Sequence, residues 1–139
     1  MSKLKAFLQK SPVGKTEEVF ISDRFQDDDG SKVPFVVKMI SQELNEEIVK
    51  SCTRKGKLNN TLYAKKMVVE CTVEPNFKDS EVCKFYGVVD PLDVPAQMLS
   101  IGEYADLQKA ILLINDLVKQ EEEDLEEAKN SSMEKTEIQ

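Results

Sequence analysis

The clearest hydrophobic pattern in the chain lies near its C-terminal end, where apolar residues recur every three to four positions. At about 100° per residue they fall on one arc of about 140°. These residues are Tyr104, Leu107, Ala110, Ile111, Ile114, Leu117 and Val118. The pattern predicts a core helix that begins after a chain break at Gly102, runs to residue 118 and extends towards residue 128. Leu112 alone stands among the polar positions, which makes it a candidate contact residue.

Alternating apolar and polar residues predict a β-hairpin in the N-terminal third of the chain. Residues 17–22 and 33–40 are rich in β-branched and aromatic side chains, and an Asp-Gly pair lies between them. In the second run, Phe35, Val37 and Met39 share one face. We therefore expect two antiparallel strands, with this face towards a core.

Four further segments have helical periodicity and suitable end signals. They span residues 42–53, 60–73, about 80–86 and 91–101. Ser41, Asp79 and Asp90 are well placed to cap three of them. Residues 67–69 fit a strand as well as a helix, so both alternatives stay open there. A break is expected at Glu74-Pro75-Asn76, and Lys55-Gly56-Lys57 is expected to close the first of these helices.

The N-terminal segment predicts a short amphipathic helical turn. Leu4, Phe7 and Leu8 have i, i+3, i+4 spacing after a possible cap at Ser2, and Ser11-Pro12 ends the turn. Such an arm either packs on its own domain or docks on another subunit. These apolar side chains are the main candidates for partner binding, together with Leu112.

Taken together, the patterns predict an α+β fold that is mostly α, with an N-terminal β-hairpin followed by four or five short helices and an acidic tail. The chain has 139 residues, which suits one domain of ordinary size. We assign residues 1–15 to an N-terminal arm and residues 16–119 to a single globular domain. Residues 120–139 form the tail.

Charge is distributed unevenly along the chain, whose formal net charge is −7. Residues 120–139 hold eight acidic and two basic residues, a net of −6, whereas the remaining 18 acidic and 17 basic residues nearly cancel. Nucleic acid is therefore excluded as the main partner, because phosphate binding requires a basic face. The tail is either solvated, with a frayed or disordered backbone, or an interaction arm.

The residue types needed for common enzyme chemistry are missing. The chain has no His, its glycines form no phosphate-binding motif, and its three cysteines lack metal-ligand spacing. The aspartates at 27–29 lack the later ligands of a calcium loop. The longest apolar run, residues 110–114, is far shorter than a membrane span. We expect a cytoplasmic, non-enzymatic protein without a metal or cofactor; a pair of carboxylates is the only catalytic group left to consider.

The order of several stretches resembles one known protein family. LKAFL at residues 4–8 is followed by VFISDRFQDDDGSKVPFVVKMIS, by TLYAKKMVVECTVEPNFKDSEVCKFYGV and by MLSIGEYADLQKAILLIN, which ends at residue 115. Together these stretches resemble the XkdN-like tail assembly chaperones of phages and prophages of Gram-positive bacteria. The resemblance covers residues 4–118.

The resemblance implies a mostly helical protein with a small β element and no catalytic residues. It implies a cytoplasmic protein that binds the tape-measure protein and keeps that long helical chain soluble while tail tube protein polymerises around it. The tail tube protein and a second copy of the chain are further candidate partners. The matched positions are expected to be structural; they are Arg24, Phe25, Pro75, Gly102 and Tyr104. The partner-binding candidates remain Leu4, Phe7, Leu8 and Leu112.

Two other functions stay open at this stage. A small acidic adaptor or inhibitor would bind through the tail, and its binding would weaken steeply with salt. A structural tail or connector subunit would instead persist in finished particles. A chaperone with an apolar contact would keep its partner at high salt.

Overall fold

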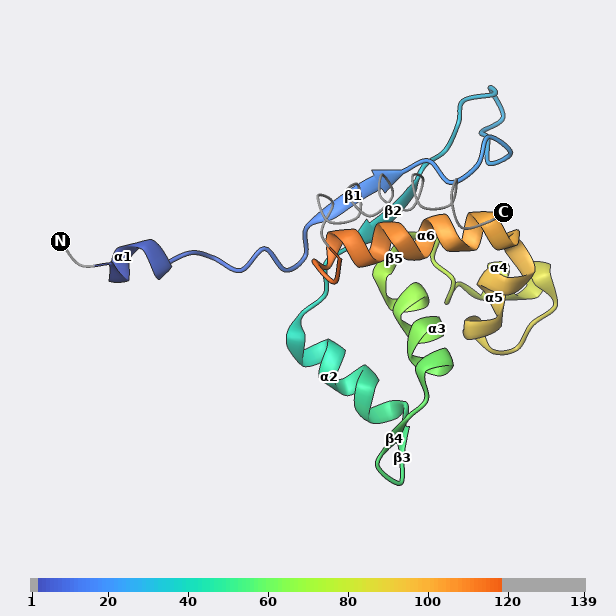
Figure 1. The fold of residues 1–139 in the computed structure, drawn as a ribbon. Coiled ribbons are helices and arrows are strands. Elements are labelled where there is room, and N and C mark those ends of the chain that lie inside the picture. Colours follow the sequence, from blue (N-terminus) through green and yellow to red (C-terminus); the bar gives the residue numbers. More distant parts are fainter. Residues whose placement is uncertain (1–2, 119–139) are drawn as a thin grey trace, which may run out of the picture.

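The computed structural model describes residues 3–118 and has the expected mostly helical α+β architecture (Figure 1). The helices are α1 (Leu4–Phe7), α2 (Gln42–Ser51), α3 (Asn60–Cys71), α4 (Ser80–Tyr86), the 3₁₀ turn η1 (Pro91–Asp93), α5 (Val94–Met98) and α6 (Ile101–Ile114). The strands are β1 (Thr16–Val19), β2 (Phe35–Lys38), β3 (Thr53–Arg54), β4 (Lys57–Leu58) and β5 (Thr72–Glu74). The predicted acidic tail, residues 120–139, lies outside the described residues.

A three-stranded antiparallel sheet in the order β1-β2-β5 forms the β part of the domain. The predicted hairpin is present as β1 and β2, paired from Thr16↔Lys38 to Val19↔Phe35. The sequence did not indicate β5, which follows α3 without a loop and pairs Thr72 with Val37 of β2. Strand β5 has only three residues and extends an apolar helical run, so periodicity alone could not separate it from the helix.

The connection between β1 and β2 is longer than the predicted hairpin suggested. The Asp-Gly pair does form its tip, where the Asp27 N–H donates to the Ser31 carbonyl at 2.8 Å. A second short pairing, Gln26↔Lys32, supports this tip. Between the strand and the tip the chain turns inward, and Phe25 packs on Phe35 with 5.1 Å between ring centroids.

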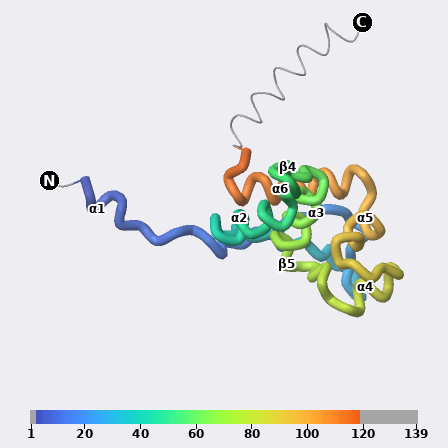
Figure 2. Tube along the Cα trace, turned by 90° about the horizontal axis from the view of Figure 1, so that it is seen from below, coloured from blue at the N-terminus to red at the C-terminus, as the bar shows by residue number. Residues whose placement is uncertain are grey.

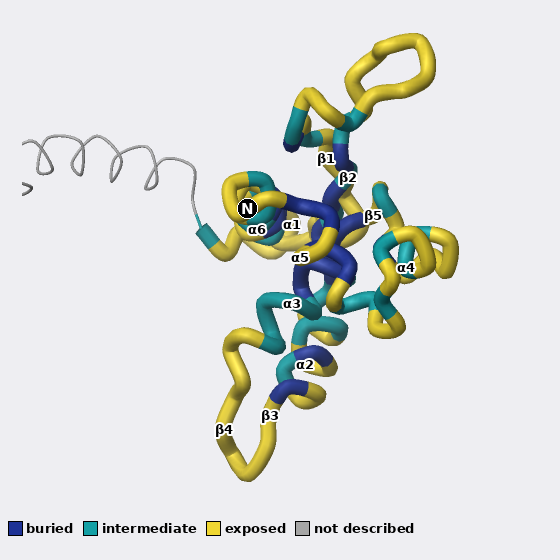
Figure 3. Tube along the Cα trace, turned by 90° about the vertical axis from the view of Figure 1, so that its right-hand side faces the viewer, coloured by how far each residue is buried: buried dark blue, intermediate teal, exposed yellow. Residues whose placement is uncertain are grey.

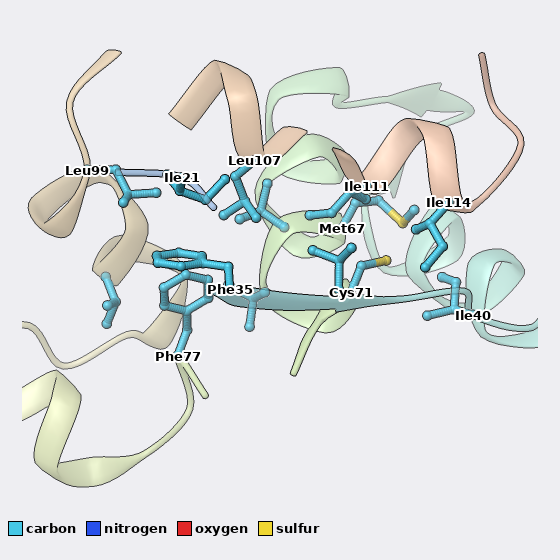
Figure 4. Packing of buried hydrophobic residues seen from close by; sticks show 14 of the residues in the cluster. Ile21, Phe35, Ile40, Met67, Cys71, Phe77, Leu99, Leu107, Ile111 and Ile114 are labelled. Atoms are coloured by element: carbon cyan, nitrogen blue, oxygen red, sulfur yellow. The ribbon is translucent and has the colours of Figure 1, made fainter. Parts of the chain in front are cut away.

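The hydrophobic core lies between the sheet and helices α3 and α6 (Figure 4). Strand β2 contributes Phe35 and Val37, which are almost fully buried, as the alternation predicted. Helices α3 and α6 face them with Val68, Cys71, Leu107, Ile111 and Ile114. One end of the core contains Phe77, which precedes α4, and Val94, the first residue of α5. Residues 67–69, for which the sequence allowed a strand or a helix, are helical.

A second, two-stranded hairpin joins α2 to α3. Ser41 caps α2 as predicted, but Lys55 and Gly56 do more than end that helix: they form the two-residue turn between β3 and β4. Both have positive φ angles, 51° and 75°, which is the geometry of a type I′ turn. The hairpin points away from the core and is exposed along its whole length (Figure 3).

Helix α6 begins earlier than predicted, because Ser100 outweighs Gly102 as a start signal. The Ser100 hydroxyl accepts from the Glu103 N–H, and the Glu103 carboxylate accepts from the Ser100 N–H, which completes a capping box. Gly102 therefore lies inside the first helical turn. The predicted chain break at Gly102 is wrong, and the break lies at Leu99, in extended conformation.

Helix α6 also ends earlier than predicted. Asp116 has a φ of 56°, and the Leu117 N–H donates to the Leu112 carbonyl at 2.9 Å. This is a Schellman motif, in which a residue in left-handed conformation ends the helix and the N–H of the next residue donates to a carbonyl of the last helical turn. The predicted continuation to residue 118 is therefore wrong, and Leu117, expected in the core, is 53% exposed. The predicted extension over residues 120–128 lies outside the described residues.

Candidate partner-binding surface

The N-terminal arm leads away from the rest of the domain (Figure 1 and Figure 2). Its single helical turn, α1, contributes nothing to the core, and Leu4, Phe7 and Leu8 are 62%, 77% and 70% exposed. Lys3 occupies the cap position without a side-chain cap, while Ser2 lies outside the described residues. The structure therefore presents the three apolar side chains of the arm to solvent.

The arm is basic as well as apolar. Its lysines are Lys3, Lys5, Lys10 and Lys15, and no acidic residue precedes Glu17. The arm is joined to the body at its end, where the Gly14 N–H donates to the Met39 carbonyl and the Met39 N–H donates to the Lys15 carbonyl, both at 2.9 Å. The body thus fixes where the arm leaves the domain, next to strand β1.

Leu112 lies in a different place, on the outer side of α6. It is 39% exposed and lines an apolar groove of about 200 Å³ between α3 and α6. The other lining residues are Tyr63, Ala64, Met67, Val68, Gln108, Ile111 and Leu117. The Schellman turn explains the local position of Leu112, because this motif brings its two flanking apolar residues together. The structure does not bring Leu112 to the arm: α1 and α6 are well separated in Figure 1.

Two further grooves, one mainly apolar and one lined by charged as well as apolar residues, were not anticipated from the sequence. One, of about 460 Å³, lies between the β1–β2 loop and α4 and includes Phe25, Val82 and Phe85. Phe85 is 81% exposed, and its ring lies edge-on to that of Tyr86. The other, of about 700 Å³, separates the β1 edge from α6 and includes Phe20 and Leu113. Both depend on tertiary packing, which local periodicity does not report.

An ion pair holds the β1–β2 loop against the start of α6. Arg24 contacts both carboxylate oxygens of Glu103, at 3.0 and 2.8 Å, donates to the Met98 carbonyl and lies over the Phe25 ring. The hydrogen bond from Arg24, followed by that from the Ser100 N–H, lowers the pKa of Glu103 to about 2. Arg24 therefore joins two elements 79 residues apart.

The described residues offer little reactive chemistry. Cys52 and Cys71 are buried and Cys83 is partly buried, and burial raises the pKa of Cys71 to about 11, so that its thiol stays protonated. Within residues 3–118 no cluster of side chains is suited to hold a metal ion. Over the same range no helix is long and apolar enough to cross a membrane. The surface features that remain are the exposed apolar arm and the grooves.

Comparisons with known proteins match this picture. The phage XkdN-like tail assembly chaperone family model matches residues 4–129. YqbN of Bacillus subtilis (strain 168) is 38% identical over 121 residues, covering 80% of each chain. The phage-like element PBSX protein XkdN from the same strain is 33% identical over 132 residues, covering 84% of this chain and 89% of its own.

The fold has a solved counterpart too. The crystal structure of YqbN superposes with a TM-score of 0.72 and 32% identity, covering 84% of this chain and 98% of that one. The residues and the fold lead to the same result, and the resemblance inferred from the sequence is confirmed. The chain belongs to the XkdN-like family of phage tail assembly chaperones.

Proposed function

We propose that the chain binds the tape-measure protein during tail assembly and keeps it soluble while tail tube protein polymerises around it. The observation that carries the proposal is the exposure of Leu4, Phe7 and Leu8 on one turn of an arm outside the core. An apolar set of this kind on a highly charged chain is typical of a protein-binding surface. In this proposal the protein acts in the host cytoplasm and catalyses no reaction.

The arm suits a helical partner for two physical reasons. Its i, i+3, i+4 apolar side chains can enter a groove on a helical chain, as amphipathic segments do elsewhere. The four lysines of the arm favour a partner with acidic residues beside its apolar contact. The arm of residues 1–15 then acts as the contact segment of a globular domain at residues 16–119.

Leu112 supplies a second, smaller contact in this proposal. It borders the apolar groove between α3 and α6, next to the exposed Leu117. Because the arm and this groove lie apart, a long partner would contact both along its length. A second copy of the chain and the tail tube protein are the alternative occupants of these contacts.

The test is co-expression with the tape-measure protein from the same genome, followed by pull-down at low and high salt. The variant Leu4→Ala/Phe7→Ala/Leu8→Ala should reduce the recovered soluble complex about tenfold or more, equivalent to about 1.4 kcal/mol of binding. A control, Val89→Ala/Ile101→Ala, removes apolar side chains that lie outside the arm and the grooves and are more exposed than those of the arm; it should leave recovery unchanged.

Leu112→Ala should cause a smaller loss, which adds to that of the arm variant. If alanine at all four positions leaves the soluble complex unchanged, this assignment of the contact residues is wrong. If the complex forms only at low salt, an acidic adaptor that binds through charge replaces the apolar contact.

A further inference from the structure

The hairpin between α2 and α3 carries an unusual concentration of positive charge. Lys50, Arg54, Lys55 and Lys57 are all exposed and lie at or beside the β3–β4 turn; we name them the basic tip. Residues 48–69 contain six basic residues and no acidic residue. Figure 3 shows the hairpin projecting from the domain, exposed along its length.

The described part of the chain does not neutralise the basic tip. Its ion pairs join Arg24 to Glu103, Lys32 to Asp23 and Lys78 to Glu70, and none of those found within residues 3–118 includes a residue of the tip. Four like charges on one short hairpin repel one another, and a negative segment beside them would relieve that repulsion. The basic tip is therefore suited to bind an acidic segment, and the chain, with a net charge of −7, is rich in acidic residues.

The chain itself contains such a segment beyond the described residues. Residues 121–127 hold six acidic residues and no basic residue. The described part of the chain ends close to the start of α2, where Leu117 lines a small pocket with Ser41 and Asn45. Helix α2 rises about 15 Å from there, and the hairpin adds roughly 10 Å.

The length of the segment is sufficient for it to reach the tip. Nine residues, from 119 to 127, span up to about 30 Å when extended. A flexible chain of that length has a root-mean-square end-to-end distance of about 16 Å. The covalent link therefore keeps the acidic groups of residues 121–127 within reach of the tip, at a local concentration in the millimolar range.

We propose that the acidic segment of residues 119–139 docks on the basic tip of the same chain. Binding within one chain is favoured over binding between chains because the covalent link supplies the high local concentration. The contact is electrostatic and exposed, so it weakens as salt screens the charges. This inference does not depend on the proposal for the tape-measure protein, since it involves neither the arm nor Leu112.

Carbodiimide crosslinking of the full-length chain tests the proposal, because it joins lysine amines directly to carboxylates in contact. Equal amounts of ¹⁴N- and ¹⁵N-labelled protein are mixed before the reaction, so that mass spectrometry separates links within a chain from links between chains. We expect Lys50, Lys55 and Lys57 to link to residues 121–127 within one chain. The yield should fall about tenfold between about 0.01 M and about 1 M salt.

Two crosslinking outcomes would overturn the proposal. The four arm lysines serve as the internal control, since they are exposed like the three lysines of the tip and are no fewer in number. Equal linking of the tail to the arm and to the tip would show that the tip has no preference. Links found only between labelled and unlabelled chains would show that docking occurs between molecules.

A second measurement separates docking from a general change of charge. In the full-length chain, Asp124→Asn/Glu126→Gln/Glu127→Gln should shift the backbone amide resonances of residues 53–58 in NMR spectra. The matched control, Glu17→Gln/Glu18→Gln/Asp28→Asn, removes three exposed acids from the body and should leave these resonances unchanged. Equal shifts in the two variants would overturn the proposal.

Discussion

Helix α6 and the N-terminal arm have the same local pattern of apolar residues but opposite environments. Leu107 and Ile111 on α6 are at most 2% exposed, and Ile114 is 3% exposed. Leu4, Phe7 and Leu8 in the arm have the i, i+3, i+4 spacing that Leu107, Ala110 and Ile111 have on α6, yet each of the three arm residues is more than 60% exposed. The pattern thus identifies an amphipathic segment but does not say which surface its apolar face meets.

Length and end signals account for the difference between the two segments. Helix α6 has 14 residues and a capping box at its start, and it packs against strands β1 and β2 of the sheet. Helix α1 has four residues and no side-chain cap, and so short a helix is marginal in water without packing. A buried face therefore requires both a stable helix and a neighbouring layer, whereas the arm has neither in this chain.

Leu107→Ala would test the buried side of this comparison and should have the largest effect. Leu107 is fully buried, so the substitution leaves a cavity among the sheet, α3 and α6. We expect the free energy of unfolding to fall by about 3 kcal/mol. Urea denaturation followed by circular dichroism measures this change.

The matched control is the arm variant Leu4→Ala/Phe7→Ala/Leu8→Ala, which removes more apolar surface from exposed positions. It should change the free energy of unfolding by less than about 0.5 kcal/mol. A loss of stability comparable to that of Leu107→Ala would mean that the arm packs on its own domain, and the comparison would fail.

Asn115→Ala would sharpen the comparison by releasing the end of α6 from the sheet. The Asn115 side chain accepts from the Ile40 N–H at 2.9 Å and donates to the Lys38 carbonyl at 3.2 Å. Loss of these partly buried hydrogen bonds should lower the free energy of unfolding by about 1–3 kcal/mol. Asn60→Ala, at an exposed position on α3, is the control; similar losses in both variants would exclude a special role for Asn115.

The ion pair at the start of α6 should make stability depend on pH. The pKa of Glu103 is lowered from 4.5 to about 2, so the folded state favours the ionised carboxylate. Its contribution is complete above pH 4.5 and is lost as the pH falls towards 2. Glu103→Gln keeps a group that can complete the capping box but removes the charge.

Unfolding measured between pH 2 and 5 would show this effect. The stability curve of the unmodified chain should fall more steeply with decreasing pH than that of Glu103→Gln. The two curves should converge at the acid end. Parallel curves would mean that Arg24 does not favour the ionised form of Glu103.

The sequence predicted those features that local chemistry controls. The Ser41 and Asp79 caps, the inward face of β2 and the core positions of α6 are where the patterns placed them. The errors lie where tertiary contacts compete with a local signal. Gly102 looked like a break, but the Ser100–Glu103 capping box overrides it. Strand β5 exists because β2 offers an edge to a three-residue segment, which no local pattern reveals.

The candidate binding residues divide in the same way. Their apolar character was evident from the sequence, but the exposure of Phe85 and the grooves beside α6 arise only from packing. The sequence identified Leu112 as the apolar residue among the polar positions of its helix. In the structure, Leu112 lines a groove together with Leu117. Local patterns therefore found single residues, whereas the surfaces that those residues form required the fold.

The smallest expected effect concerns the residue that ends α6. Asp116 adopts a left-handed conformation, φ 56°, at a position where glycine is the usual residue. Asp116→Gly removes the steric penalty at Cβ but makes the unfolded chain more flexible, so a net gain of about 0.5–1 kcal/mol is expected. Asp116→Ala is the control, because it keeps the penalty and should not stabilise. Urea denaturation measures both, and an equal gain in the two variants would mean that the Asp side chain, rather than its backbone conformation, is unfavourable at the end of the core helix.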